Sequence, residues 1–276
     1  MKRFLLILFL LTVSYSKAQI LRWAADVESG APYVFQDPES PSELIGFEAD
    51  IMEAIANELS VETRFIQNRW GGLIPGLDRG DYDLAINGLE ITDDRKKEVY
   101  FSVPYYVTFE QIVVRRGDKR IQTLEDMKGK KVGTLRACLA EKIMNDAGGI
   151  QVHSYDSEVN SFEDLKNQRL DAVLIDAPVA VYYAGWNPDL ELTGEPIGKV
   201  TYGIAIKKGN DELLNQINSA LNSIIENGKL REILESWNLW NELIAEELND
   251  HTQSVSTPDK YQKFISAQQT EITFMD

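Results

Sequence analysis

Apolar residues recur along this chain with two different spacings, and the two spacings alternate from one segment to the next. A spacing of four, typical of an amphipathic helix, begins after Gly46 and involves Phe47, Ile51, Ile55 and Leu59. Short apolar runs of strand length stand before and after such helical patterns. Strands that alternate with helices throughout predict an α/β architecture, in which helices cover the faces of sheets.

The same pattern, together with turn-forming residues, predicts the remaining elements. Strands are expected at 21–25, 61–66, 83–86, 112–115, 131–135, 151–155, 171–175 and 202–206. Helices are expected through Leu73 and Leu77 and at 124–128, 139–147, 158–168, 177–184, 210–227, 229–237 and 241–248. The segment 26–43 is rich in Pro, Ser and Glu and must be a loop, and the Pro- and Gly-rich stretch that ends at Gly198 carries no predicted element.

The first 18 residues, 1–18, have the pattern of a secretory signal peptide. Lys2 and Arg3 form its basic start, 4–13 its apolar core, and 16–18 a cleavage site of the small-x-small type. The core is shorter than the roughly 20 apolar residues that a membrane span needs, so an uncleaved anchor is disfavoured. No later stretch is apolar enough to cross a bilayer. We therefore expect the mature protein to be exported to the periplasm.

Net charge and the scarcity of two residue types disfavour several classes of function. The formal net charge of −16 over 276 residues argues against binding to nucleic acid or to an anionic membrane. Cys138 is the only cysteine and cannot form an internal disulfide, and His153 and His251 are the only histidines. Nothing in the sequence ties either histidine to the thiol as a base, and so small a set is a poor zinc site. We expect no catalytic cysteine, no metal site and no cofactor.

The most informative stretch runs from the expected strand 83–86 through the glycine-bearing turn 87–90. Thr92 is predicted to cap the next helix, with acidic residues in its first turn and Arg95 one turn in. A guanidinium beside free backbone N–H groups, at the end of a strand, is a good receptor for a carboxylate. Alternatively, Arg95 pairs at the surface with one of the two aspartates that precede it.

Several motifs follow one another along the chain: GFEADIMEAIANEL, WGGLIPGLDRGDYDLAI, GLEITDDRKK with VYFSVPYY after it, LDAVLID and GKLREILESW. Together they resemble the bacterial extracellular solute-binding proteins of family 3, which bind amino acids for ABC importers. The resemblance covers Leu21 to Trp240, nearly all of the expected mature chain.

The resemblance implies an α/β fold of the type II periplasmic-binding-protein class, with two lobes and a ligand in the cleft between them. The first lobe is expected to comprise residues 19–107 and 207–240, and the second lobe residues 108–206. Hinge crossovers are expected near 107–110 and 200–205. The remaining residues, 241–276, are predicted to form a helix and then a polar, mostly disordered tail.

The resemblance also implies which residues contact the ligand. Arg95 and the backbone around Gly88 hold the ligand's carboxylate, and Asp176 holds its ammonium. Trp70 lines the ligand's side chain, and Tyr33 lies at the cleft edge in an A-P-aromatic signature. The residues themselves leave alternatives open, because Trp70 could belong to the core and Asp176 could cap the helix after its strand.

The chain departs from the family pattern at two places. In the turn 136–139 a Gly-Thr-Thr-like sequence is replaced, so that the backbone N–H of Leu139 remains as a donor but a hydroxyl is lost. Glu90 replaces a small hydroxyl residue. If its carboxylate faces the cleft with Asp26 or Glu28, the pocket favours a cationic or hydrogen-bond-donating ligand side chain, although Arg136 in the turn opposes this. Alternatively, Glu90 is solvated.

We therefore predict a protein that encloses an amino acid, or a related small zwitterion, by hinge closure and delivers it to an ABC transporter permease. It is expected to be a monomer and to catalyse no reaction. One rival is an enzyme on the same fold, a dehydratase of cyclic prearomatic acids, with Glu90 or Asp176 as its general acid. Another is the ectodomain of a signalling system, which the lack of a second membrane span disfavours.

Overall fold

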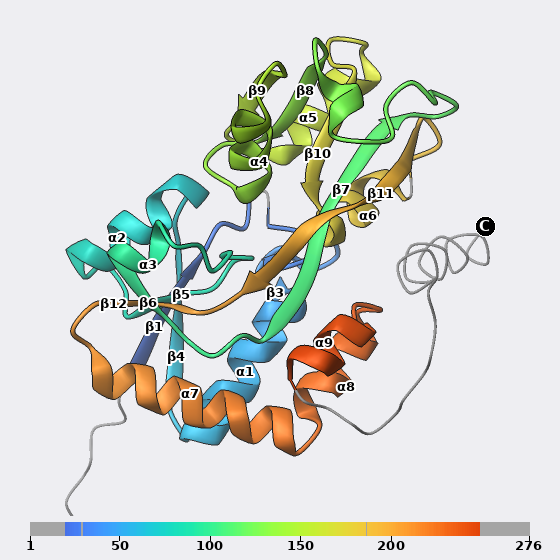
Figure 1. Cartoon of the computed structure of the whole chain (residues 1–276). Coiled ribbons are helices and arrows are strands. Elements are labelled where there is room, and N and C mark those ends of the chain that lie inside the picture. Colours follow the sequence, from blue (N-terminus) through green and yellow to red (C-terminus); the bar gives the residue numbers. More distant parts are fainter. Residues whose placement is uncertain (1–19, 29, 186, 249–276) are drawn as a thin grey trace, which may run out of the picture.

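The computed structural model describes residues 20–28, 30–185 and 187–248 and arranges them in two lobes, each a sheet with helices on its faces (Figure 1). The expected signal peptide and the expected tail after residue 248 lie outside the described residues. Within the described residues, no helix has both the length and the apolar character of a membrane span.

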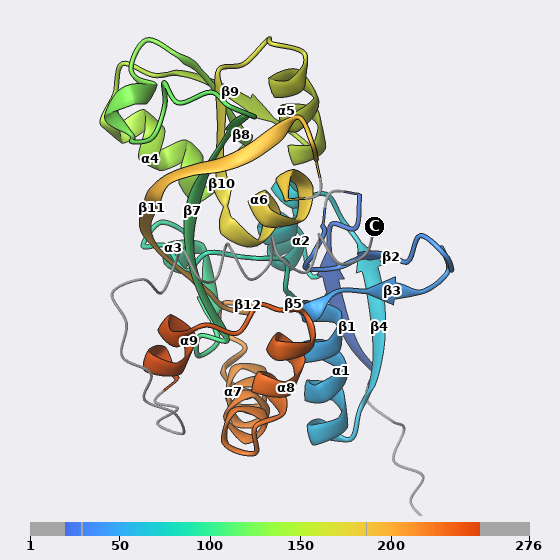
Figure 2. The same ribbon diagram turned by 90° about the vertical axis from the view of Figure 1, so that its right-hand side faces the viewer.

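The first lobe is built on a sheet with the strand order β4-β1-β5-β12-β6. Its strands are β1 (Ile20–Ala25), β4 (Glu62–Gln67), β5 (Leu84–Ala85), β6 (Val99–Phe101) and β12 (Ala205–Lys207). Its helices are α1 (Phe47–Leu59), α2 (Leu73–Arg79), α3 (Arg95–Glu98), α7 (Asp211–Glu226), α8 (Lys229–Ser236) and α9 (Glu242–Glu247), and a 3-10 turn spans Trp70–Gly72. A small hairpin, β2 (Phe35–Gln36) with β3 (Leu44–Ile45), projects beside α1 (Figure 2).

The second lobe is built on a sheet with the strand order β11-β7-β10-β8-β9. Its strands are β7 (Tyr106–Arg115), β8 (Lys131–Leu135), β9 (Gln151–Tyr155), β10 (Ala172–Asp176) and β11 (Leu190–Tyr202). Its helices are α4 (Leu139–Ala147), α5 (Glu158–Lys166) and α6 (Ala177–Ala184), and a 3-10 turn spans Glu125–Met127. The α/β class and the two lobes predicted from the sequence are confirmed.

Helix α1 shows how the apolar spacing positions the core. The face that carries Phe47, Ile51 and Ile55 is fully buried, and α1 packs against α7 on the first sheet. Burying a large apolar side chain contributes about 1.5–3 kcal/mol, so this face fixes how the helix lies. The loop ends that lead into the cleft are thereby held on a rigid base.

Strands β7 and β11 form a long antiparallel pair that runs from the second sheet toward the first (Figures 1 and 2). The prediction for this region was partly wrong. β7 begins at Tyr106 rather than Ile112, and the part of the Pro- and Gly-rich stretch from Leu190 to Gly198 belongs to β11. β11 is an edge strand with two irregularities in its register, and both edge position and bulges accommodate Gly and Pro.

Other element boundaries also differ from the expectation. The strand expected at 202–206 is divided, because β11 ends at Tyr202 and β12 begins at Ala205. Helix α3 begins at Arg95 itself, although the Thr92 hydroxyl does accept a hydrogen bond from the Arg95 amide at 3.2 Å. The proposed lobe boundaries within the connecting strands stay a prediction.

Candidate ligand-binding cleft

A small cavity lies between the two lobes. Its lining residues are Asp26, Tyr33, Trp70, Asn87, Gly88 and Glu90 from the first lobe and Leu135, Cys138, Glu158, Ile175, Asp176 and Val179 from the second. Five of the seven predicted site residues are in this lining. The other two, Arg95 and Leu139, line a wider groove outside it.

Arg95 projects from the start of α3 and contacts both lobes. Its Nη1 forms a close ion pair with the Glu90 carboxylate and donates to the Glu90 carbonyl oxygen at 3.1 Å. Its Nη2 donates across the cleft to the carbonyl oxygen of Ala137 at 2.8 Å. The preceding aspartates, Asp93 and Asp94, pair instead with lysines, so the expectation of a surface pair for Arg95 is wrong.

The carboxylate of Glu90 occupies the position that the sequence assigned to a ligand's carboxylate. One oxygen lies on the Arg95 guanidinium, and the other accepts a hydrogen bond of 2.8 Å from the amide of Leu139 in the opposite lobe. The side chain is only 2% exposed, which excludes the solvated alternative. Glu90 thus separates both predicted anion donors from the cavity.

The turn before α4 keeps its backbone donors, as the sequence suggested, but these N–H groups are already bonded to carboxylates of the protein. Ala137 adopts a positive φ of 58°, and its amide donates to Glu141 at 2.6 Å. The Cys138 thiol lies 3.3 Å from the Thr134 hydroxyl, and burial raises its pKa well above the ordinary value, which works against a reactive thiolate. Arg136 pairs with Asp156 at 2.8 Å on the surface. The prediction that its positive charge opposes a cationic ligand in the pocket is therefore wrong.

Asp176 ends β10 and directly precedes α6, yet its side chain makes no capping hydrogen bond. Instead its Oδ2 accepts hydrogen bonds from the hydroxyls of Tyr202 at 2.6 Å and Tyr33 at 3.1 Å. The two hydroxyls are 2.9 Å apart. Tyr33 belongs to the first lobe, so this small network also crosses the cleft. The sequence analysis did not single out Tyr202, although its place in the expected returning strand puts it near the hinge.

Glu110 is the functional candidate that the sequence analysis missed. It lies on β7 directly opposite Asp176 in the antiparallel register, and it is completely buried. Among the described residues, its carboxyl group has no hydrogen-bond partner other than the Asp176 carboxyl. The only signal was an acidic residue within a mainly apolar stretch of β7, on the same face as Ile112.

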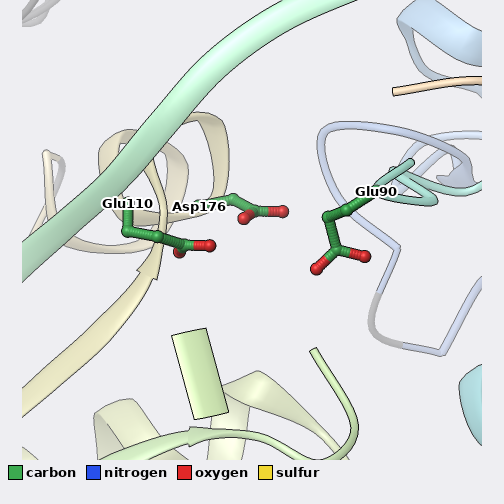
Figure 3. A group of neighbouring side chains, drawn as sticks. All are labelled: Glu90, Glu110 and Asp176. Carbon is green, nitrogen blue, oxygen red and sulfur yellow. The ribbon is translucent and has the colours of Figure 1, made fainter. Parts of the chain in front are cut away.

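The carboxyl groups of Glu90, Glu110 and Asp176 converge in the cleft (Figure 3). One oxygen from each lies within 4.8 Å of the others, a spacing at which a cation could meet all three. Burial, with the charge of Glu90 as the next contribution, raises the pKa of Asp176 to about 7. Burial and the neighbouring carboxylates likewise raise the pKa of Glu110 well above its usual range. Such shifts favour the protonated forms of these carboxyl groups, and Glu110 and Asp176 also share a hydrogen bond.

Trp70 is half-buried at the cleft edge, and its position depends on Asp26. The Trp70 amide donates to Asp26 at 2.8 Å, while the indole N–H donates to the Arg136 carbonyl oxygen at 2.9 Å across the cleft. The Arg95 guanidinium lies 5.2 Å from the centre of the ring. Asp26 therefore orients the tryptophan, whereas Glu28 is exposed and takes no part in the lining. Trp70 also packs against the buried cluster of the first lobe that contains Leu73 and Leu77, so the core alternative describes one side of the ring.

Gly88 is positioned by a buried carboxyl group that the sequence analysis did not identify. Its amide donates to Glu48 at 2.7 Å, so this N–H is not free for a ligand's carboxylate. Burial raises the pKa of Glu48 to about 8. Gly88 has a positive φ of 59°, and a Cβ there would come within 3.0 Å of the Tyr33 ring. Glycine therefore brings the turn close to Tyr33.

Two α/β lobes joined by paired strands, with convergent polar groups in the cleft between them, define a bilobal solute-binding protein. Residues 21–239 match the family model of the bacterial extracellular solute-binding proteins, family 3, and the chain belongs to this family. The family prediction is thereby confirmed.

Individual relatives are likewise named as amino-acid-binding proteins. The L-cystine-binding protein TcyJ of Escherichia coli K12 is 34% identical over 209 residues, which cover 75% of this chain and 78% of the relative. An ancestral arginine-binding protein bound to glutamine has a similar structure, with a TM-score of 0.75, 38% identity and coverage of 80% and 98%. The ancestral amino-acid-binding protein AncCDT-1, a precursor of cyclohexadienyl dehydratase, has a TM-score of 0.73, 30% identity and coverage of 79% and 95%.

Proposed function

We propose that the chain captures an amino acid, or a related small zwitterion, in this cleft and delivers it to an ABC importer. The observation that carries the proposal is that polar contacts from the predicted site residues join the two lobes. They connect Arg95 with Ala137, Glu90 with Leu139, and Tyr33 with Asp176. A ligand held by the same groups would bind both lobes at once and stabilise their closure.

The ammonium of the solute is received at Asp176. The Asp176 carboxyl is buried and keeps one oxygen clear of the two tyrosine hydroxyls, which both donate to Oδ2. Glu110 faces the same space. In this buried place an ammonium ion gains charge-assisted hydrogen bonds and stabilises the ionised form of Asp176.

The carboxylate of the solute is received by Arg95 and by the amide of Leu139. These two groups already bind a carboxylate, that of Glu90, in the geometry expected for a charge-assisted site at a helix N-terminus. In the proposed cycle the lobes open, Glu90 withdraws, and the ligand's carboxylate takes its place. Trp70, over the guanidinium, then contacts the solute's side chain.

The relatives support transport rather than chemistry. The curated relatives bind amino acids for ABC transporters, among them the ABC transporter arginine-binding protein 1 of Escherichia coli K12. By analogy we propose that this chain acts in the periplasm after removal of residues 1–18, as a monomer, and with a permease in the inner membrane as its partner. We further propose that it catalyses no reaction. Aromatic product formed from prephenate or arogenate would contradict this, since a protonated Asp176 could serve as a general acid.

A thermal-shift screen of the common amino acids on dialysed protein tests the proposed function. A solute at 100 times its dissociation constant should add about 2.7 kcal/mol to the free energy of unfolding. At least one amino acid or small zwitterion should raise the thermal midpoint in a concentration-dependent way. If none does at millimolar concentration, and none binds by calorimetry, the proposal is wrong.

A further inference from the structure

Glu90 has the contacts that a bound ligand's carboxylate would have. Its two oxygens meet the guanidinium of Arg95 in one lobe and the amide of Leu139 in the other. These two donors line the outer groove, whereas Glu90 itself lines the enclosed cavity. From inside the cavity the anion donors are therefore covered by a carboxylate that belongs to the protein.

We propose that Glu90 is a resident competitor for the anion subsite and shifts the selectivity of the cleft from α-amino carboxylates toward primary amines that lack the α-carboxylate. This inference rests on the proposed function, namely that the cleft captures a solute bearing an ammonium group. It goes beyond that function by naming the residue that sets how much affinity the solute's α-carboxylate adds.

Competition with Glu90 disfavours a ligand's carboxylate. Because Glu90 is covalently part of the site, its effective concentration at Arg95 is high, on the order of millimolar or more for a short tether. A ligand's carboxylate must displace it. The displaced side chain, now 2% exposed, would then lie without its arginine close to Asp176 and Glu110. Like charges at that distance oppose the exchange.

The other half of the cleft is well suited to an ammonium group. An ammonium nitrogen donates three hydrogen bonds, and acceptors about 2.8 Å away in tetrahedral directions lie about 4.6 Å from one another. The oxygens of Glu90, Glu110 and Asp176 lie within 4.8 Å of one another. Glu110 is the independent indication of a ligand here, because it is fully buried and its carboxyl group faces those of Asp176 and Glu90 (Figure 3), with no partner among the described residues other than the Asp176 carboxyl.

The balance of charge favours a cation over a zwitterion. Among the described residues that line the enclosed cavity there are four acidic side chains and no lysine or arginine. Arg95 neutralises Glu90 from outside. A primary amine therefore adds a positive charge beside these acidic side chains, whereas an amino acid also brings a carboxylate into a cavity that has no basic side chain in its described lining.

Calorimetry on matched pairs of solutes tests this inference. The pairs are arginine with agmatine, lysine with cadaverine, and leucine with isopentylamine, in which each amine lacks only the carboxylate. They are titrated into the wild type, Glu90→Ser and Glu90→Gln. Asp93→Ser is the matched control, because it removes one negative charge from the same loop at a side chain that is 96% exposed.

Both Glu90 variants should shift the ratio of the two dissociation constants toward the amino acid by at least about tenfold, mainly by strengthening its binding. Asp93→Ser should leave the ratio unchanged. Circular dichroism and the thermal midpoint identify a misfolded variant, and Glu90→Gln keeps the side-chain volume if Glu90→Ser is unstable.

A shift smaller than this in every pair that binds, or a shift in the opposite direction, overturns the inference while leaving the proposed function intact. Absence of binding by every solute to the wild type and to both Glu90 variants instead contradicts the proposed function, and the inference fails with it.

Discussion

The two halves of the cleft differ in how far the protein satisfies its own polar groups. The anion half, which would receive a ligand's carboxylate, consists of Arg95 and the Leu139 amide, and both are bonded to Glu90. In the cation half, Asp176 receives two hydroxyls, but Glu110 has only the Asp176 carboxyl as a partner among the described residues. A filled half admits a ligand group only by exchange, whereas an unfilled half gains from any donor that enters. We infer that the cation half drives capture and the anion half adjusts selectivity.

The largest expected effect is that of Arg95→Ala. Removing one partner of a buried charge pair costs about 2–5 kcal/mol, so amino acids should lose at least about 30-fold in affinity. The matching amines should lose much less, because they do not use the guanidinium. Arg79→Ala, which removes an exposed arginine paired with Asp81, is the control. Amino-acid affinity that stays at the wild-type level in calorimetry would place the anion subsite elsewhere.

The unbalanced charge of the cation half should appear in the pH dependence of stability. The folded-state pKa of Asp176 is raised from 3.8 to about 7, so the folded protein binds this proton more tightly than the unfolded chain. The resulting stabilisation is complete below about pH 4 and is lost as the pH rises toward 7. The thermal midpoint of the ligand-free wild type should therefore fall over this range more steeply than that of Asp176→Asn. Parallel curves for the two proteins would show that folding does not raise the pKa of Asp176.

A moderate effect is expected at Trp70. Trp70→Phe keeps a ring beside Arg95 but loses the hydrogen bond to the Arg136 carbonyl oxygen, which should weaken binding several-fold, at about 1 kcal/mol. Trp240→Phe is a matched control, since Arg231 lies 5.1 Å from the Trp240 ring but neither residue lines the cavity. Equal effects of both substitutions on the dissociation constant would mean that Trp70 acts only through general stability.

The smallest effect is expected from the C-terminal segment. Apolar periodicity ends after Leu248, so truncation after Asn249 should leave ligand affinity unchanged within about twofold. A tenfold or larger loss, measured by the same titration, would show that this segment takes part in binding or closure.

The sequence predicted the fold and much of the site because both depend on local patterns. Amphipathic spacing gave α1, and the bounds of α4 and α6 were predicted as they stand. Arg95 and Asp176 follow strands in motifs that carry the family resemblance. These features are encoded within a few residues of each other, so a single sequence is sufficient to find them.

The partners of those residues could not be predicted, because they depend on long-range packing. Glu90 accepts a hydrogen bond from Leu139 across the cleft, and Glu48, on a helix distant in sequence, accepts one from the Gly88 amide. Glu110 became a candidate only when the pairing of β7 with β10 set it opposite Asp176. The edge strand β11 was missed because its Gly and Pro residues indicate a loop unless bulges are known.

Calorimetry on Asp176→Asn with one bound solute and its deaminated analogue tests the central claim most directly. The claim is that Asp176 receives the solute's ammonium. The substitution should weaken the ammonium-bearing solute by at least about tenfold and its deaminated analogue by much less, since the analogue has no charge for Asp176 to balance. An equal loss of affinity for both compounds would contradict the claim and would assign Asp176 a structural role in holding Tyr33 and Tyr202.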